Sequence, residues 1–377
     1  MDAHKSLQTS PFVIITSDRN GGSRSFFSIL TGKYYEINKK NLQILEYCKY
    51  PREVSKLLEQ FEGKIIDELA SNKLLADPLT VWEQTNIEYM EIEISTMCNW
   101  KCEYCPYTFD PKPPKVMDMD VYNEIIDKAQ RHPTLETIAF NAFNEPTLDP
   151  YFEDRIHKLA QTDLKLRLFT NGSNLDERKI KLIKDTNVIE KIKFNLPSID
   201  RTEFNRLTGS KLFERTMTNI ERAILEGFEV EIIVNGTKEE VEKNISEIEK
   251  RFKVFDNVNV VHYITMDRAG LLKNKYAMNY YHKEELCGCS KIIKELNISV
   301  DGDFLICTMD YYQNDVFGNI KDGEISDILK SEKAQLIRRG VFGAETTPDD
   351  YICRKCWAIM LARFDGRYSK SIKPVLK

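Results

Sequence analysis

The sequence has little of what marks membrane, exported or nucleic-acid-binding proteins. No apolar run approaches the roughly 18 residues of a membrane-spanning helix, and the opening segment MDAHKSLQTSPFVIIT has no basic stretch followed by a long apolar one. The net charge of −5 lacks the basic excess that is typical of a nucleic-acid footprint. We therefore expect a cytoplasmic protein with neither a membrane nor a nucleic-acid partner.

Histidine is also scarce, with five residues, whereas there are nine cysteines. In a reducing compartment so many thiols indicate metal binding or catalysis rather than a disulfide framework. Three cysteines lie between positions 98 and 105, and five lie between 287 and 356. Cys48 stands alone at helical spacing from Leu45, so we expect it to be a buried core thiol.

The middle of the chain, residues 85–270, alternates strand and helix patterns. Amphipathic helices, among them Val121–Ala129 and Phe213–Ile224, separate the strand candidates. This order predicts an α/β fold with a parallel sheet wound in one hand. Six units favour an open, partial (β/α)6 TIM-like barrel over a closed eight-stranded barrel. The strand candidates are residues 89–95, 137–143, 165–170, 191–197, 229–235 and 258–265.

Two smaller domains are expected to flank this barrel. Residues 1–80 contain two strand-like runs, SRSFFSIL and GKYYEIN, followed by three segments with helical periodicity. Residues 271–377 predict a hairpin around NISVDGDFLIC with its turn at Asp301–Gly302, then a helix over Ile325–Arg338 and a cysteine-containing tail.

The first cysteine group directly follows the first barrel strand, in the segment STMCNWKCEYCPY. Cys98, Cys102 and Cys105 have the spacing C-x3-C-x2-C. A zinc ribbon needs four ligands and usually presents them as two separated pairs. Three thiolates in one tight loop can instead bind three irons of a [4Fe–4S] cube and leave the fourth iron open to a chelating ligand. The alternative is a loop of three structural thiols.

These residues resemble the motif of the radical S-adenosylmethionine (SAM) superfamily, C-x3-C-x-aromatic-C, with Tyr104 as the aromatic residue. The resemblance implies that SAM chelates the open iron of a [4Fe–4S] cluster on Cys98, Cys102 and Cys105. An electron from the cluster, delivered by an external donor such as flavodoxin or ferredoxin, would cleave SAM to methionine and a 5′-deoxyadenosyl radical. That radical abstracts hydrogen from the substrate, so the protein would be an oxidoreductase whose cofactors supply the radical chemistry.

The same resemblance implies further contacts with SAM. The stretch NAFNEPTLDP matches a Gly-Gly-Glu-Pro-like turn after the second strand, with Glu145 kept as an acceptor for the SAM amino group and Asn144 in place of a glycine. Other residues match an aromatic beside the adenine, a Ser/Thr-Asn-Gly turn after the third strand, and a ribose-binding position in the fourth. The residues implied at the cofactor are Tyr104, Asn144, Glu145, Thr170, Asn171 and Asn195.

The second cysteine group resembles the Twitch domain, a shortened SPASM domain that binds one auxiliary [4Fe–4S] cluster. The implied ligands are Cys289, Cys307, Cys353 and Cys356, and no cysteine follows Cys356 as a full SPASM domain would require. Two cysteine pairs are also typical of a structural zinc site, so zinc, or no metal at all, are the alternatives. Cys287 could be a spare ligand, a catalytic thiol or a bystander.

Residues 1–80 resemble the PqqD-like RiPP recognition element, a winged-helix-like domain that binds the leader of a ribosomally made precursor peptide. The resemblance implies that the leader adds a strand along Tyr34, Tyr35 and Ile37 and lays apolar side chains on the third helix, Ile65–Leu74. The alternative is a winged-helix cap that only packs on the barrel.

Taken together, these features favour a maturase that abstracts hydrogen from a precursor peptide and gives an oxidative crosslink or an epimerisation. The first alternative is a Twitch-type dehydrogenase of a small molecule such as an aminocyclitol or sugar; the second is a non-enzymatic iron–sulfur or zinc scaffold. An oxidation needs a base, for which Asp310 is the candidate near Cys307, with a solvated loop carboxylate as its alternative. His262 in the last strand is interpreted as a barrel histidine with its hydrogen bonds satisfied.

Overall fold

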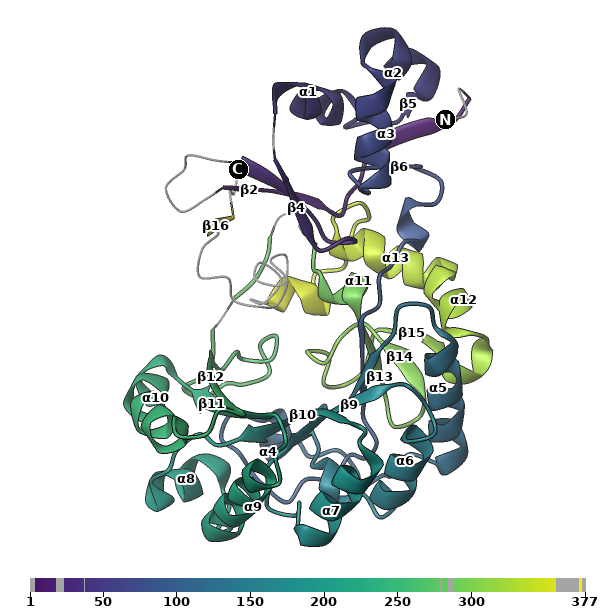
Figure 1. Ribbon diagram of the computed structural model, residues 1–377. Helices are drawn as coiled ribbons and strands as arrows, with labels where there is room; N and C mark the ends of the chain where they lie inside the picture. Colours follow the sequence, from purple (N-terminus) through teal and green to yellow (C-terminus); the bar gives the residue numbers. More distant parts are fainter. Residues whose placement is uncertain are drawn as a thin grey trace.

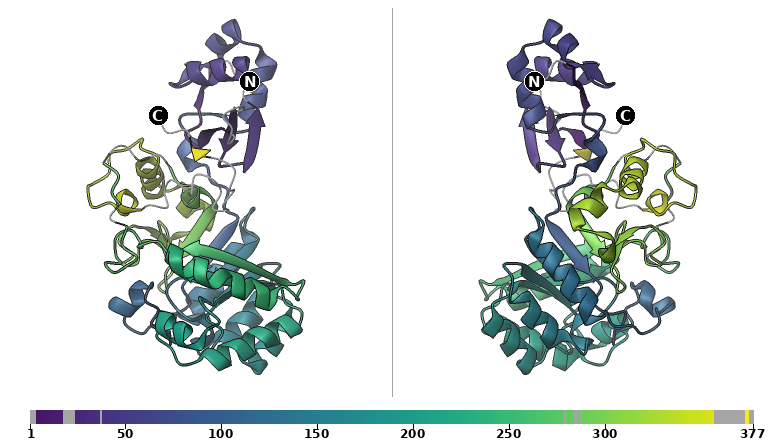
Figure 2. Two further views of the ribbon diagram at one scale, coloured as in Figure 1. Left: turned by 90° about the vertical axis from the view of Figure 1, so that its left-hand side faces the viewer. Right: turned by 90° about the vertical axis from the view of Figure 1, so that its right-hand side faces the viewer.

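Three units follow one another along the molecule (Figure 1). The structure is a computed structural model and describes residues 4–17, 24–36, 38–278, 280–283, 286, 288–356 and 373–374. The N-terminal unit lies at one end, the barrel lies at the other, and the C-terminal unit lies between them, as the two side views also show (Figure 2). None of the helices in this described part is long and apolar enough to cross a membrane.

One nine-stranded sheet forms the barrel wall and continues beyond it, in the order β12-β11-β10-β9-β8-β7-β13-β14-β15. Strands β7 to β12 pair in parallel with their neighbours, which confirms the six predicted parallel strands. Within the described residues β12 has no partner on its outer side, so the sheet is open there. The six strands are β7 (Tyr89–Ile92), β8 (Thr137–Phe140), β9 (Lys165–Thr170), β10 (Ile189–Asn195), β11 (Val230–Gly236) and β12 (Val258–Ile264).

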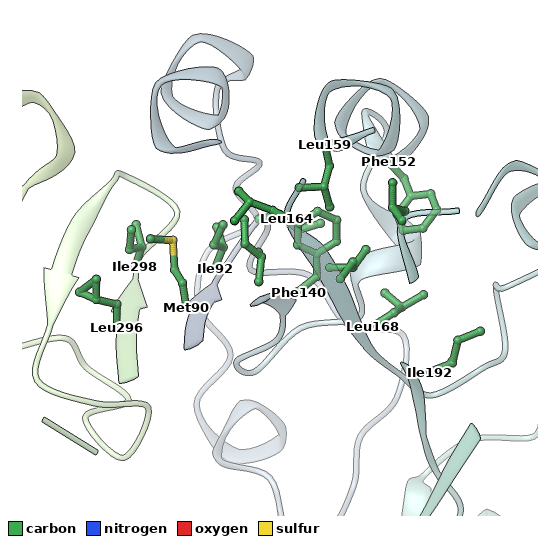
Figure 3. Close-up of a cluster of buried hydrophobic side chains, with 14 of the residues drawn as sticks. Met90, Ile92, Phe140, Phe152, Leu159, Leu164, Leu168, Ile192, Leu296 and Ile298 are labelled. Atoms are coloured by element: carbon green, nitrogen blue, oxygen red, sulfur yellow. The ribbon is translucent and has the colours of Figure 1, made fainter. Parts of the chain in front are cut away.

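Side chains alternate across this sheet, as the strand period of two requires. The outward-facing residues are apolar and pack against the surrounding helices in one large core, part of which is drawn in Figure 3. The inward-facing residues are largely charged, for example Glu91, Lys193 and Glu231. The covering helices are α5 (Met119–Arg131), α6 (Phe152–Leu159), α7 (Glu177–Thr186), α8 (Arg201–Thr208), α9 (Phe213–Leu225) and α10 (Lys238–Phe252).

The predicted hairpin is confirmed, and it is joined to the barrel. Strand β13 (Glu295–Ile298) pairs antiparallel with β14 (Asp303–Leu305), and Gly302 takes a φ of +84° in the turn. The sequence did not predict that β13 also pairs in parallel with β7. Leu296 and Ile298 therefore lie beside Met90 and Ile92 in the same apolar layer (Figure 3). Strand β15 (Val316–Asn319) completes the sheet.

The predicted single helix over Ile325–Arg338 is wrong, because two helices occupy this stretch. Helix α12 (Ile325–Lys330) ends before Ser331, whose backbone is extended. The Ser331 Oγ then accepts a hydrogen bond from the Ala334 N–H at 3.2 Å and caps α13 (Glu332–Val341). The short helices of the chain are α4 (Pro106–Phe109), α11 (Lys291–Lys294), η1 (Val81–Glu83), η2 (Pro146–Leu148), η3 (Ile320–Asp322) and η4 (Ile352–Lys355).

The N-terminal unit has the two expected strands and three helices, with additional strands that the sequence did not predict. Cys48 is fully buried in its core, which confirms the expected core thiol. Its sheets have the orders β5-β1-β6 and β16-β2-β3-β4. The elements are β1 (Ser6–Thr9), β2 (Val13–Ser17), β3 (Arg24–Ser28), β4 (Lys33–Glu36), α1 (Lys39–Tyr47), β5 (Arg52–Glu53), α2 (Val54–Gln60), α3 (Gly63–Ser71), β6 (Leu75–Ala76) and the distant β16 (Lys373–Pro374).

The N-terminal unit packs on the C-terminal unit through a shared apolar core. Phe12 contacts Trp82 and Phe342 edge-on, with ring centroids 5.6 and 4.9 Å away. The same core contains Ile293 and Cys353 of the C-terminal unit. The two units are therefore held together by buried apolar surface, which stabilises by roughly 25 cal/mol per Å².

His262 does not behave as the sequence predicts. It is exposed on β12, where Asn259 and Ile264 are exposed as well. The interpretation as a barrel histidine with satisfied hydrogen bonds is wrong, because β12 is the outermost described strand and its free side is left open to solvent.

Candidate functional site

The first cysteine loop follows β7 and is held by the C-terminal end of α8. The backbone N–H groups of Lys101 and Glu103 donate to the last carbonyls of that helix, at 2.9 and 3.0 Å. Gly209 ends α8 in the left-handed conformation and passes directly under Lys101. Trp100 packs edge-on against Phe204 of α8, with ring centroids 5.1 Å apart. The loop is thus positioned by a helix distant in sequence.

The three thiols of this loop are free and lie close to one another. Burial, followed by the charge of Glu145, raises the pKa of Cys98 to about 12. Burial raises the pKa of Cys102 most, and the thiolates of Cys105 and Cys98 raise it further. Thiols that oppose each other's ionisation in this way are suited to a cationic centre, which stabilises all the thiolates together. This donor set therefore fits an iron–sulfur cluster.

Glu145 connects the turn after β8 with the turn after β9. Its side chain is buried, and its Oε1 accepts hydrogen bonds from the hydroxyls of Thr147 and Thr170, both at 2.6 Å. Its Oε2 accepts the N–H of Asn171 at 2.6 Å. Burial raises the pKa of Glu145, while these hydrogen bonds lower it. Because most of its lone pairs are occupied, a SAM amino group would have to share Oε2.

Asn144 has a buried acceptor without a donor among the described residues. Its Nδ2 donates to the carbonyl of Ser95, but its Oδ1 has no hydrogen-bond partner among the described residues. A buried amide oxygen without a partner is rare in folded proteins. Its place beside Glu145 and the cysteine loop fits the ammonium group of SAM, which is a donor only.

A chain of amides surrounds the aromatic residue of the motif. The Tyr104 hydroxyl accepts a hydrogen bond from Asn195 Nδ2 at 2.7 Å, and Asn195 Oδ1 accepts one from Asn235 Nδ2 at 2.9 Å. Tyr276 packs edge-on against the Tyr104 ring at 6.0 Å. Sequence reasoning missed Asn235 and Tyr276; the signal for Asn235 was its place near the end of β11, the strand beside β10, which ends at Asn195.

A second amide pair contacts the cysteine loop from the turn after β9. Asn171 Nδ2 donates to Asn99 Oδ1 at 2.8 Å, and Asn99 Nδ2 donates to Ser173 Oγ at 2.9 Å. Asn171 also reaches the Cys98 thiolate. The structure thus gathers all six residues expected at SAM around the cysteine loop. Sequence reasoning missed Asn99, although it lies inside the motif itself.

The second set of thiols gathers at the junction of the N- and C-terminal units. Burial raises the pKa of Cys289 to about 12, with Cys356 as the next contributor. Burial also raises the pKa of Cys353, and the thiolates of Cys307, Cys356 and Cys289 raise it further. In the described part of the chain, no three side chains of Cys, His, Asp or Glu are arranged to hold a single metal ion. Cys287 lies outside the described residues.

Asp310 is buried, which contradicts the alternative of a solvated loop carboxylate. Its Oδ2 accepts the N–H of Asp315 at 2.8 Å, and the N–H groups of Gln313 and Asn314 also donate to this side chain. Burial nevertheless raises its pKa. The carboxylate closes the loop that follows Cys307, so its position is explained by local structure.

Comparison with known protein families identifies the class to which this fold and site correspond. The Radical SAM superfamily matches residues 92–252, and the SPASM family, an iron–sulfur cluster-binding domain, matches residues 289–357. The chain therefore contains a radical SAM domain followed by a SPASM domain. These domains carry a SAM-binding [4Fe–4S] cluster and an auxiliary iron–sulfur cluster.

Individual relatives are more distant. A tungsten-containing aldehyde ferredoxin oxidoreductase cofactor-modifying protein of Pyrococcus furiosus is 30% identical over 102 residues, 27% of this chain and 29% of that protein. A GTP 3′,8-cyclase of Mannheimia succiniciproducens is 28% identical over 220 residues, 56% of this chain and 62% of the cyclase. The chain thus spans less than two thirds of the length of these curated relatives.

Among solved structures, SuiB of Streptococcus suis bound to its precursor peptide SuiA shares the fold. The TM-score is 0.57 at 13% sequence identity, and the likeness covers 94% of this chain and 96% of SuiB. Because the likeness covers 94% of this chain, it includes most of the N-terminal unit. At this identity the likeness concerns the fold alone.

Proposed function

We propose that this chain is a peptide maturase that cleaves SAM and abstracts hydrogen from a ribosomally made precursor peptide, giving an oxidative crosslink or an epimerisation. One observation carries the proposal: the fold matches, along nearly the whole chain, a protein solved with its precursor peptide. A radical SAM barrel alone would not favour a peptide over a small molecule. The N-terminal unit is the feature that favours a peptide substrate over a small molecule.

In this function the residues around the cysteine loop bind and orient SAM. Cys98, Cys102 and Cys105 would hold the cluster, and Asn144 Oδ1 with Glu145 Oε2 would receive the SAM ammonium. Tyr104, held by Asn195, would lie against the adenine. When bound, the cluster and SAM supply the 5′-deoxyadenosyl radical that removes hydrogen from the substrate. An external donor such as flavodoxin or ferredoxin would deliver the electron.

The second thiol set would hold one auxiliary cluster in the shortened, Twitch form of the SPASM domain. Cys353 is buried and Cys289, Cys307 and Cys356 are partly buried. Four thiols that affect one another in this way are enough to ligate every iron of one cube. Full ligation leaves no iron for substrate, so this site would pass electrons rather than bind the peptide.

The leader would be bound at the outer edge of β4. In the described residues β4 pairs only with β3, so its other edge can accept a strand. Tyr34 is 47% exposed there, and Ile65 of α3 lies partly buried at the surface of the unit's core. The Tyr35 hydroxyl shares a hydrogen bond of 3.1 Å with Thr31. Ile37, the remaining expected contact, lies outside the described residues.

The test is binding of a fluorescent peptide encoded beside the gene. We expect Ile65→Glu to weaken binding at least about tenfold, since burying an isoleucine contributes roughly 1.5–3 kcal/mol. Leu58→Glu is the matched control, because Leu58 is an exposed apolar residue, 46% accessible, on the neighbouring helix α2. Equal affinity of the two variants, or full binding after removal of residues 1–80, would favour a cap that does not recognise peptide.

A second function, oxidation of a small polar molecule, is favoured by the charged inner face of the barrel. Lys193 pairs with Glu231 at 2.7 Å, and Arg167 pairs with Glu190 at 2.7 Å, both partly or largely screened from water. Such a wall suits a polar ligand. SAM cleavage stimulated by a sugar or aminocyclitol in the absence of peptide would support this function over the maturase.

A further inference from the structure

A small crevice lined by both charged and apolar residues lies inside the barrel, between the two sets of cysteines. The first set follows the carboxyl end of β7. Cys289 and Cys307 instead lie toward the amino end of β13, because Cys289 precedes that strand and β14 runs back antiparallel before Cys307. The strands are parallel neighbours, so the two sets lie toward opposite ends of them.

Two residues of the crevice are register partners on these two strands. Glu91 of β7 lies opposite Asn297 of β13. Met90 and Ile92 face the outer apolar core, so Glu91 points to the inside of the barrel. Its neighbour on the other side is Ala139 of β8, whose small side chain leaves room beside the carboxylate. The crevice has space of about 20 Å³, enough for one water-sized group.

Both side chains carry a buried oxygen that no donor of the described residues satisfies. Glu91 is 8% exposed and Asn297 is 3% exposed, and neither Glu91 Oε2 nor Asn297 Oδ1 has a hydrogen-bond partner among the described residues. Asn141 donates a hydrogen bond to the Glu91 side chain. Buried acceptors without a partner destabilise a fold by about 1–3 kcal/mol each, so two in one crevice form a place for a bound donor group.

The other carboxylates of the crevice are fully engaged. Glu93 Oε1 pairs with Lys112 Nζ at 2.7 Å, and Glu93 Oε2 accepts a hydrogen bond from Gln313 Nε2 at 2.7 Å. Asp310 closes the loop after Cys307, as described above. Glu91 is therefore the carboxylate of this crevice with an oxygen left for a ligand.

The crevice adjoins the surroundings of both thiol sets. Phe143 lines it and packs edge-on against Tyr311 at 4.9 Å, while Arg268 lies over the Phe143 ring at 5.5 Å. Arg268 acts on the charge of Cys105. On the opposite side the crevice is lined by Thr308, next to Cys307. Ala142, also in the lining, is held at a φ of +104°, a strain of the kind that concentrates at functional sites.

We propose that Glu91 accepts the proton that leaves the substrate when the substrate radical is oxidised to product, and that Asn297 orients the donor group beside it. The proposal rests on the proposed function, because it needs a hydrogen-abstraction step on a bound substrate. It gives Glu91, rather than Asp310, the role of the base.

The step balances in atoms and electrons. Removal of one hydrogen atom leaves a radical on a substrate carbon. Formation of a closed-shell oxidised product then requires the loss of one proton and one electron. The proton goes to Glu91 Oε2, and the electron goes to an oxidised iron–sulfur cluster at the second thiol set. A substrate between the two sets could lose its hydrogen atom toward the first set, where SAM would bind, and its electron toward the second set.

The surroundings of Glu91 raise its pKa above the ordinary glutamate value, chiefly through burial. Burial raises the pKa of this carboxyl, Lys291 lowers it and Glu295 raises it, with a further lowering by Lys193. A raised pKa brings a carboxylate closer to the working pH, where a general base is most effective. Several other titratable groups face Glu91 or share its crevice. They are Tyr89 of β7, Glu93 directly after β7, Lys112, Lys193 of β10, Lys291 of α11, Glu295 of β13, and Asp310.

The test compares Glu91→Gln with Glu93→Gln, two isosteric changes in the same crevice. Each reconstituted protein is given SAM, a reductant and the deuterated precursor peptide. We expect Glu91→Gln to transfer deuterium to 5′-deoxyadenosine within about threefold of the wild-type rate, but to form at least about a hundredfold less product per 5′-deoxyadenosine, as expected for loss of a general base. Glu93→Gln is expected to keep the wild-type ratio within about twofold, and Glu91→Asp to restore part of it.

A second measurement needs neither substrate nor cofactor. Infrared spectra of the protein over a pH series are expected to contain a carboxyl band that titrates above the ordinary glutamate range in the wild type and in Glu93→Gln, and that is missing in Glu91→Gln. An identical band in Glu91→Gln, or an unchanged product ratio, overturns the proposal. If no variant transfers deuterium from peptide while the band behaves as expected, the maturase function fails and Glu91 remains the titrating group of the crevice.

Discussion

Gly209 offers a way to test how the cysteine loop is held in place. The residue ends α8 at a φ of +59°, and a Cβ built there would lie 2.6 Å from the carbonyl oxygen of Lys101. Atoms in good contact are roughly 3.5–4.0 Å apart, so Gly209→Ala would push this carbonyl by about 1 Å. Lys101 directly precedes Cys102, and the displacement would therefore move a cluster ligand.

Gly227 is the matched control because it isolates the clash from the backbone conformation. It also follows a helix, α9, with a φ of +85°, but a Cβ there meets no atom within 4 Å. An alanine in the left-handed region costs about 1–2 kcal/mol in either position. We expect both variants to lose about that much stability in urea unfolding, with an additional loss for Gly209→Ala alone.

The decisive assay is the iron content after anaerobic reconstitution. Two [4Fe–4S] clusters give about eight irons per chain, and loss of the one on the loop leaves about four. We expect Gly209→Ala to fall toward four and to lose the change that SAM causes in the electron paramagnetic resonance spectrum, whereas Gly227→Ala keeps both. If the two alanine variants have the same iron content and the same response to SAM, the docking of the loop on α8 does not position the cluster.

Two further predictions follow from the pKa values. Burial acts to raise the pKa of Glu240, but hydrogen bonds, the largest from Lys275, lower it to about 2. The ionised carboxylate therefore stabilises the fold above about pH 4.5, and this stabilisation is lost as the pH falls toward 2. Urea unfolding of Glu240→Gln should lack this pH dependence, and an unchanged pH slope in the variant would contradict the reasoning. Burial raises the pKa of Cys48 to about 11, so mass spectrometry should find it unreacted with iodoacetamide in native protein at pH 8 and alkylated only in denaturant; equal reaction in both would refute its burial.

The sequence predicted those parts of the fold that depend on local patterns. Strand β9 was predicted with its observed bounds, because Leu166 and Leu168 alternate with Lys165 and Arg167 and a turn follows Thr170. The break at Ser331 was missed because the apolar spacing continues through it, although serine is a good N-cap residue. The pairing of β13 with β7 could not be predicted, since two strands about two hundred residues apart carry no local sign of their register.

The residues of the candidate site likewise fall into those that a local sequence motif indicates and those that it does not. The cysteines and the turn at Asn144 and Glu145 lie in compact motifs, so the resemblance to a family was enough to propose them as site residues. Asn235, Tyr276 and Glu91 carry no motif, and their roles depend on neighbours from other strands. Asp310 was singled out by its proximity to Cys307 in sequence; the structure buries it and has its carboxylate close its own loop, and its role as a base stays a prediction.

The pairing of β13 with β7 also constrains how a peptide can reach the site. The hairpin that leads to Cys307 is hydrogen-bonded into the barrel sheet, and the N-terminal unit shares a buried core with the region around Cys353. Such contacts are broken only with loss of the core, so the edge of β4 proposed to bind the leader, the second thiol set and the barrel would keep fixed separations during turnover. A leader bound on β4 would then act as an anchor, and the reach of the substrate would be set by the number of residues between leader and modified position. A longer spacer should shift the modification to another residue of the peptide rather than abolish it. The separations within the protein would stay fixed, so only the length of the peptide tether would change.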